Sequence, residues 1–403
     1  MRCAGDVTAL TETTQVNPRQ DMSDNEREGQ GVEEPPDEER RPVEQPPPME
    51  GGQDERDERL RNQQAQIESL TSINTVLRDN HVPNRLTPEV LQHSRVPAYF
   101  KYATGFTYDQ FNNLCTVFSI PSSETAQQTS VPLTYSRTDW QINTMPLRVQ
   151  LLLVLMKLRQ NHDLKDLAFR FMIDERSVGT LFNAWVDYMF TVLGELPAWP
   201  HRDIIMAHMP GKYREEFPTT MAILDCTELK IQTPSSLVLQ SQSYSTYKSA
   251  NTLKSLIACD PRGSVIFCST LFTGSMSDKE IVRQSNFIEL MKNLLKHGYL
   301  QEGDGLMVDK GFLIENDLQE IGLEINIPPF VRGKRQMPST DVCLTKKVAA
   351  HRIHVERAIS KIKKFKIVSE RIPNIRLRNI NQIWYVVSML SNFQPCILKN
   401  TIT

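Results

Sequence analysis

The sequence predicts an α/β protein in which a mixed β-sheet is flanked by helices and preceded by a helical region. Two observations indicate this fold. Residues 146–192 contain apolar runs that begin at helix-capping residues, and short apolar runs separated by turns and helices follow from Thr219 onward. Short apolar runs bounded by turn residues are typical of strands, and strands that alternate with helices indicate a mixed sheet. A third feature, an acidic and polar N-terminus, predicts a disordered tail.

The charge is divided unevenly along the 403 residues. Residues 1–60 hold 17 Asp and Glu against 7 Lys and Arg, a net charge of −10, whereas the whole chain has −2, so the rest carries +8. An acidic tail on a basic body points to nucleic acid or another acidic partner. Residues 1–59 are rich in Pro, Glu, Gln and Arg and lack aromatic side chains. We therefore expect them to be disordered.

Composition also argues against a membrane protein and a disulfide-bonded one. The longest apolar run, Leu151–Met156, is too short to cross a bilayer, and the start of the chain has no apolar segment of signal-peptide length. The seven cysteines are scattered and never spaced C-x-x-C, which argues against a disulfide framework and a cysteine zinc site. We expect no membrane partner and a reducing compartment, the cytosol or the nucleus.

Residues 60–80 carry a short heptad pattern that is interrupted by the polar residues Gln63 and Asn74. A single Asn in such a seam can fix the register of a dimer. The segment predicts either a short coiled coil, through which the chain would form a homo-oligomer, or an amphipathic helix that packs on its own chain. Residues 81–145 are expected to be a linker and a region of mixed structure.

Residues 146–200 predict a helix-turn-helix-like region, whose second and third helices can be capped by Asp163 and Asp174. Met172 stands at the turn, where such motifs usually have Gly. The third helix begins with acidic residues and offers only Arg176 to a phosphate, so the region either reads DNA or packs on the next domain. Its packing positions are apolar: Leu167, Ala168, Ile173, Val178, Leu181 and Trp185.

Residues 215–395 are expected to form the sheet and its covering helices. The predicted strands are Met221–Leu224, Leu253–Cys259, Val265–Phe272, Gly305–Val308 and Leu323–Ile327, and the predicted helices are Asn286–Leu295 and Leu344–Phe365.

Three carboxylates stand out in this region. Asp225 and Asp309 each follow a short apolar strand, and Glu356 lies in the middle of the last long helix. Carboxylates at strand ends can converge at one edge of a sheet, and three oxygen donors suit Mg²⁺ or Mn²⁺. Two such cations, ~3.5–4 Å apart, can activate a nucleophilic oxygen and stabilise a leaving one. Each acid alone is also compatible with a turn, cap or surface position.

Six short sequence words occur in a fixed order: Leu224–Glu228, Tyr244–Lys248, Asn251–Lys254, Gly274–Lys279, Val308–Phe312 and His354–Arg357. Together they resemble the DDE superfamily endonuclease domain of Harbinger-like transposases, in the branch found in animal proteins, often beside a THAP zinc finger. The resemblance covers about residues 145–395. The finger itself is missing, because the N-terminal region lacks the cysteines and histidines that it needs.

The resemblance implies an RNase H-like fold and a metal-dependent DNA endonuclease. It assigns the metal-binding acids to Asp225, Asp309 and Glu356, with Mg²⁺ or Mn²⁺ as the cofactor. Asp278 matches a further acid of the family and is expected beside the metal centre as an accessory acid, or simply as a loop cap. Transposases of this type can also depend on a separate DNA-binding partner protein.

A basic stretch surrounds Glu356. Residues 332–378 hold 14 Lys and Arg against three acids. Such a stretch neutralises DNA phosphates, although a solvated helix or a nuclear-import patch would look the same. We expect a nuclear protein whose DNA contacts come from Arg352, Arg357, Lys361, Lys363, Lys364, Lys334 and Arg335. Tyr244, Tyr247 and Lys248 either line the substrate channel or form a packed hairpin.

Two functions remain open at this level, with a third less favoured. The first is a transposase-derived endonuclease that cleaves DNA phosphodiesters with two divalent cations. The second is a domesticated transposase that binds DNA or protein without cleavage, which the missing finger favours. The third is an RNase H-type nuclease that acts on RNA-containing substrates.

Overall fold

The computed structural model describes residues 58–68, 85–96, 98–121, 133, 140–329 and 338–396. The chain divides into two compact units, residues 1–80 and 81–403. In the first unit, residues 58–68 are helical, two residues ahead of the predicted start at residue 60. The predicted disorder of residues 1–59 falls, apart from its last two residues, outside the described residues, and so does the second half of the heptad pattern. No helix of the described ranges is long and apolar enough to cross a membrane.

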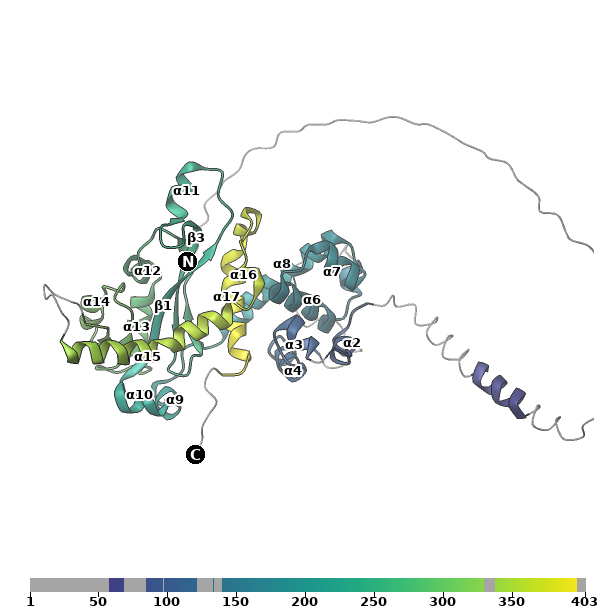
Figure 1. Cartoon of the computed structure of the whole chain (residues 1–403), viewed down its shortest axis with the longest axis horizontal. Coiled ribbons are helices and arrows are strands. Elements are labelled where there is room, and N and C mark those ends of the chain that lie inside the picture. Colours follow the sequence, from purple (N-terminus) through teal and green to yellow (C-terminus); the bar gives the residue numbers. More distant parts are fainter. Residues whose placement is uncertain are drawn as a thin grey trace, which may run out of the picture. The chain divides into compact units, whose positions relative to one another are not determined.

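The second unit is built on a mixed sheet (Figure 1). Within the described residues its strands are β1 (Thr220–Lys230), β2 (Tyr244–Ser245), β3 (Ala250–Cys259), β4 (Val265–Cys268), β5 (Phe272–Thr273), β6 (Gly305–Met307) and β7 (Glu324–Asn326). Their order is β2-β3-β1-β6-β7, with β4 and β5 also paired to β3. β3 is antiparallel to β1, whereas β6 and β7 continue the sheet in parallel. This arrangement confirms the predicted RNase H-like class.

The helices of the second unit precede the sheet, alternate with its strands and follow it. They are α2 (Pro88–Gln92), α3 (Tyr99–Thr104), α4 (Tyr108–Val117), α5 (Trp140–Asn143), α6 (Leu147–Gln160), α7 (Leu164–Phe171), α8 (Glu175–Glu195), α9 (Arg202–Ala207), α10 (Gly211–Glu216), α11 (Leu237–Ser243), α12 (Asp278–Gln284), α13 (Phe287–Lys296), α14 (Glu315–Gln319), α15 (Ser339–Ile362), α16 (Lys366–Ser369) and α17 (Ile380–Leu390). Two short 3₁₀ helices, η2 (Asn374–Arg378) and η3 (Ser391–Phe393), flank α17.

The first strand is longer than its apolar run. Met221–Leu224 was predicted to end at Asp225, but β1 continues to Lys230. The reason is the pairing with β3, which runs unbroken to the partners Lys230 and Thr252 and satisfies the backbone of the polar half of the strand. Asp225 therefore lies in the middle of a strand, opposite Ile257, and not at its end.

The predicted strand Val265–Phe272 is divided into β4 and β5. Ser269 separates them: its hydroxyl accepts a hydrogen bond from the Leu256 amide at 2.9 Å, in place of a backbone carbonyl. A side chain that takes a ladder position in this way interrupts the regular strand pairing. The other predicted strands and helices differ from the observed ones by a few residues at their ends, with the long helix beginning earliest, at Ser339.

Helices cover both faces of the sheet. Asp225 shares a face with Ile257 and Ser255, because cross-strand partners and residues two apart point the same way. On that face Trp384 of α17 donates a hydrogen bond to the Ser255 hydroxyl at 2.9 Å, and α15 packs across β1 and β3. Lys254 points to the other face, where α12 and α13 lie (Figure 1).

The helix-turn-helix-like region has the predicted elements. α7 begins and ends at the predicted residues, and the predicted packing positions are buried or packed against the core. Met172 adopts the left-handed conformation, with φ 53° and ψ 47°, at the turn where Gly is usual. Asp174 caps α8, since its carboxylate accepts a hydrogen bond from the Ser177 amide at 2.9 Å.

This helical region packs directly against the sheet domain. α8 lies along α17, where Asn379 donates a hydrogen bond to the Asn183 side chain at 2.9 Å. The rings of Phe190 and Tyr385 meet edge to face with centroids 5.3 Å apart. Within the region expected to be linker and mixed structure, α3 packs against α6 and buries aromatic side chains such as Phe100 and Phe106.

Candidate active site

The two aspartates of the predicted triad lie side by side on neighbouring parallel strands. Ile223 of β1 pairs with Met307 of β6, and Asp225 and Asp309 each follow two residues later. Equal offsets from one paired position bring the two side chains to the same face of the sheet. One guanidinium, that of Arg352, contacts both: its Nη2 is 3.6 Å from Asp225 Oδ1, and its Nη1 is 3.1 Å from Asp309 Oδ1.

Glu356 approaches the pair from α15. It lies one helical turn after Arg352, so both side chains project from the same side of the helix. Glu356 is exposed, yet it is close enough for its negative charge to raise the pKa of Asp225. The structure therefore brings all three predicted acids to one region, with Asp225 and Asp309 in the closest association.

Asp225 is held in a site that disfavours its negative charge. Burial raises its pKa to about 6, against the opposing effects of Arg352 and of the Cys226 amide, which donates to Asp225 Oδ1 at 3.0 Å. The charges of Glu356 and Asp278 act in the same direction as burial. A group of carboxylates that repel one another is stabilised by a cation, and in this structure the cation is Arg352.

Asp278, the accessory acid, lies on the other side of β1. It begins α12 after the cap Ser277, and its carboxylate forms an ion pair of 2.6 Å with Lys254 Nζ. It also packs against Gly311, where an added Cβ would come within 2.8 Å of Asp278 Oδ2. Burial and a hydrogen bond with Asp278 raise the pKa of the Cys226 thiol, which places the carboxylate beside Cys226 and not on the Asp225 face.

The donor set agrees in chemistry with a hard divalent cation, since it consists of carboxylate oxygens. Within the described ranges, however, no group of three His, Cys, Asp or Glu side chains is arranged closely enough to hold a metal ion. The Asp225–Asp309 pair is gathered around a guanidinium instead. The residues therefore fit such a cation by donor type and by their convergence on one positive charge, provided that Arg352 gives way.

The predicted DNA-binding residues fall into separate groups. Arg352 contacts the aspartates. Lys363 lies near them, donating a hydrogen bond to the Glu228 carbonyl of β1 at 3.0 Å, and its pKa is lowered by burial and by the nearby Lys248. Arg357, Lys361 and Lys364 line a cavity on another side of α15, whereas Lys334 and Arg335 lie outside the described residues.

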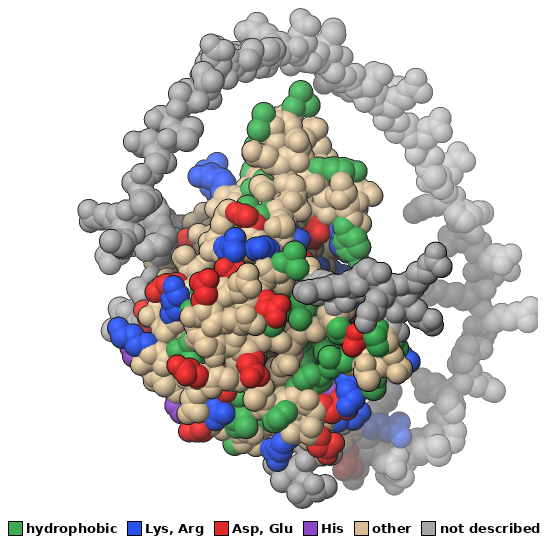
Figure 2. All heavy atoms as spheres, turned by 90° about the vertical axis from the view of Figure 1, so that its left-hand side faces the viewer, with side chains coloured by type: hydrophobic (Ala, Val, Ile, Leu, Met, Phe, Trp, Pro, Cys, Tyr) green, Lys and Arg blue, Asp and Glu red, His purple; other side chains and the backbone are tan. Residues whose placement is uncertain are grey.

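The segment between β1 and β3 carries exposed aromatic and apolar side chains. Tyr247 is 82% exposed, and Lys248 Nζ lies 4.3 Å from its ring centroid, so this tyrosine is not part of a packed hairpin. Tyr244 is also exposed. Figure 2 shows hydrophobic side chains at the top of the molecule, where α11 lies, above a face on which acidic and basic side chains are mixed. The exposed residues of α11 include Leu237, Val238 and Leu239.

The fold and this convergence of carboxylates are typical of a nuclease domain. Residues 224–392 match the family model described as "DDE superfamily endonuclease", and residues 143–195 match the one described as "Helix-turn-helix of DDE superfamily endonuclease". The chain therefore carries a DDE superfamily endonuclease domain preceded by the helix-turn-helix of that superfamily, as the sequence words predicted.

The chain is also similar to a protein of Xenopus laevis described as "Putative nuclease HARBI1", with 30% identity over 98 residues. The match spans 24% of this chain and 26% of that protein, about a quarter of each. No solved structure matches the chain.

Three features of the site were missed by the sequence reasoning. Lys254 was part of a recognised word, but nothing in the sequence indicated its ion pair with Asp278. Arg352 was predicted to contact DNA because of its charge, and its contacts with the aspartates depend on the orientation of α15. Lys101 and Arg159, which line the cavity described below, come from segments far from the basic stretch and carry no local signal.

Proposed function

We propose that the sheet domain is a metal-dependent DNA endonuclease in which Asp225, Asp309 and Glu356 hold two divalent cations, Mg²⁺ or Mn²⁺. The observation that carries the proposal is the convergence of Asp225 and Asp309 on one guanidinium, with Glu356 one helical turn away. Membership of the endonuclease superfamily supports the same reaction class. The metal set and the triad are our assignment.

The cations would supply Lewis acidity and a metal-activated water for attack on a phosphodiester. The residues of the chain hold and position the reacting groups. Asp225 and Asp309 provide oxygen ligands from a rigid sheet, and the buried position of Asp225 strengthens its interaction with any cation. Arg352 neutralises the pair before metal arrives, and once displaced its guanidinium is available to a DNA phosphate.

DNA would lie across the Asp225 face and be bound mainly through its phosphates. Lys363 and Lys248 lie beside this face, and Tyr247 offers an exposed ring on which a base can stack. The side of α8 that faces α17 is occupied by packing. We therefore propose that the helix-turn-helix adds little base reading and that end recognition falls to a separate DNA-binding partner protein. Nuclear localisation and self-association through the N-terminal helix remain predictions.

The test is a cleavage assay on a labelled duplex of the transposon-end type and on an unrelated duplex, with Mn²⁺, Mg²⁺ or EDTA. We expect metal-dependent cleavage by the parent chain and a loss of at least 100-fold in Asp309→Asn, with DNA binding retained. Cleavage by Asp309→Asn at the parent rate would refute the triad. Absence of cleavage by the parent under all conditions, with DNA binding intact, would favour the alternative, a domesticated transposase that binds DNA or protein without cutting.

A further inference from the structure

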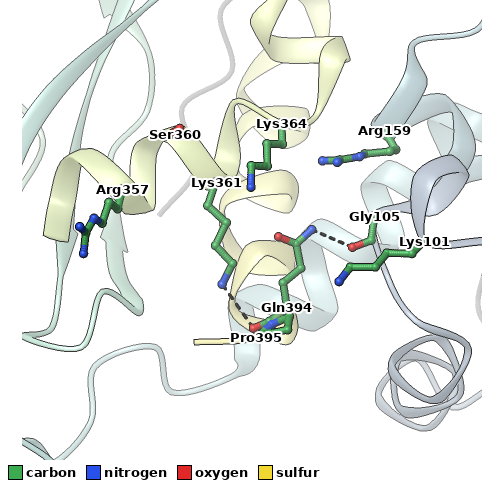
Figure 3. A pocket seen from close by; sticks show the side chains of 9 residues that line it. All are labelled: Lys101, Gly105, Arg159, Arg357, Ser360, Lys361, Lys364, Gln394 and Pro395. Carbon is green, nitrogen blue, oxygen red and sulfur yellow. Dashed lines mark hydrogen bonds between the residues drawn. The ribbon is translucent and has the colours of Figure 1, made fainter. Parts of the chain in front are cut away.

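A cavity of about 410 Å³ lies on a different side of α15 from the carboxylates (Figure 3). Its walls come from α3, the end of α6, the second half of α15 and the segment after η3. Five cationic side chains line it, and none of its described lining residues is acidic. We call it the cationic pocket, defined by Lys101, Gly105, Arg159, Arg357, Ser360, Lys361, Lys364, Gln394 and Pro395.

Hydrogen bonds join the elements around the cationic pocket. The Gln394 amide donates to the Gly105 carbonyl at 3.1 Å, and Lys361 Nζ donates to the Gln394 carbonyl at 3.3 Å. Gly105 ends α3 with φ 88°, and a Cβ there would lie 3.2 Å from Gln394 Nε2 and 3.3 Å from Arg159 Cδ. The close approach of three segments thus requires a residue without a side chain, and the walls are fixed before any ligand binds.

The cations of the pocket lack compensating charge. Among the described residues, none of the five forms an ion pair with a carboxylate, and Arg159 Nη1 is buried without a hydrogen-bond partner. Arg159 instead lies over the ring of Phe365, with its guanidinium carbon 5.7 Å from the centroid. Burial lowers the pKa of Arg159, and burial together with the neighbouring Lys364 lowers the pKa of Lys361. An anion in the pocket would relieve these costs.

The position of the pocket relates it to the active site. Lys361 lies half a turn round α15 from Arg352 and about 13 Å further along the helix axis, at ~1.5 Å per residue. Figure 3 shows Arg159 and Lys101 approaching from one side and Lys361 and Lys364 from the other, with Arg357 at the margin. Arginine and lysine groups that converge from opposite walls match the several oxygens of a phosphate.

We propose that the cationic pocket is a phosphate-binding site separate from the carboxylate site. Its ligand is a phosphate group, supplied either by the DNA backbone or by a free polyphosphate. Occupation of the pocket would hold the helical region against the sheet domain, because Lys101 and Arg159 belong to the first and Lys361 and Lys364 to the second. The DNA source rests on the proposed function, whereas the free source does not.

The test uses the full chain in EDTA, so that no result depends on cleavage. Pyrophosphate is the free probe, and its binding is followed by calorimetry and by thermal unfolding. A 20-base-pair duplex is the DNA probe, and its dissociation constant is measured from 50 to 200 mM KCl. The variant is the double substitution Lys101→Gln, Lys364→Gln, which changes two exposed side chains and preserves the fold. The matched control is Lys212→Gln, Lys296→Gln, which changes two exposed lysines away from the pocket.

We expect pyrophosphate to bind the parent and the control and to bind the variant at least tenfold more weakly. If DNA affinity also falls at least fivefold in the variant alone, with a salt slope reduced by about 1 per phosphate contact, the ligand is the DNA backbone. Unchanged DNA affinity would assign the pocket to a free polyphosphate. Equal pyrophosphate binding by variant and control, or none by the parent, would overturn the proposal. Failure to cleave DNA with pyrophosphate binding intact would count against the proposed endonuclease alone.

Discussion

Replacing Asp225 by Asn should stabilise the metal-free protein. Asp225 lies in the middle of β1 with its side chain only 25% exposed, and burial raises its pKa from 3.8 to about 6 despite the nearby Arg352. The folded protein therefore favours the neutral form of this side chain. Asn has nearly the shape of that neutral form and removes the charge, so the substitution should relieve a cost that the native protein retains for cation binding.

The size of the effect follows from the pKa of Asp225. A rise of about 2 pKa units corresponds to about 3 kcal/mol, and partial exposure reduces our expectation to about 2 kcal/mol. Because the pKa is higher in the folded state, the folded protein binds more protons between pH 4 and 6. Stability of the parent should therefore fall as the pH rises through this window. Asp225→Asn should gain about 2 kcal/mol above pH 6 and almost nothing at pH 4.

The assay is urea unfolding of the full chain in EDTA at pH values from 4 to 8. Glu215→Gln is the matched control, since this exposed carboxylate on α10 should change stability by less than about 0.5 kcal/mol at every pH. A variant that is less stable than the parent at pH 8 would refute the reasoning. A gain that is the same at pH 4 and pH 8 would also refute it, because the gain must follow the ionisation of Asp225.

Three further substitutions test other parts of the account. Arg352→Gln should lower stability in EDTA by about 1 kcal/mol, because two carboxylates lose their shared partner, and should tighten Mn²⁺ binding in calorimetry; weaker Mn²⁺ binding would contradict the displacement of this guanidinium. Gly274→Ala should cost at least about 2 kcal/mol in urea unfolding, since its Cβ would lie 2.1 Å from Thr252 Oγ1 and 2.7 Å from the Ser243 carbonyl oxygen; an unchanged midpoint would show that the approach is looser than described. Met172→Gly should raise the melting temperature, because a left-handed residue with a side chain costs ~1–2 kcal/mol, and a lower melting temperature would show that the Met172 side chain contributes packing that outweighs this strain.

Much of the fold could be predicted because local chemistry decides it. Asp174 caps α8 as expected, and α7 begins and ends at the predicted residues because its apolar pattern and flanking residues agree. The strands that are wholly apolar were also found. β1 was cut short because its second half is polar, and the pairing with β3 that extends it to Lys230 is a long-range effect.

The candidate site could be predicted only in part. The sequence words selected Asp225, Asp309 and Glu356, and the structure brings these acids to one region. The contacts of Arg352 could not be predicted, since a basic residue four positions before an acid on a helix indicates only a shared side of that helix. The cationic pocket left no sequence signal either, because it assembles segments that are separated by more than two hundred residues, such as those of Lys101 and Lys361.

The most direct test of the central claim, that these carboxylates form a divalent-cation site, is a calorimetric titration of the full chain with Mn²⁺ at pH 7.5. We expect the parent to bind Mn²⁺ with a stabilisation that rises with its concentration, by about 2.7 kcal/mol at ~100 times the dissociation constant. Asp309→Asn should lose this binding while its unfolding midpoint in EDTA stays within about 1 kcal/mol of the parent. Mn²⁺ binding of equal strength in both proteins, or none in the parent, would contradict the claim.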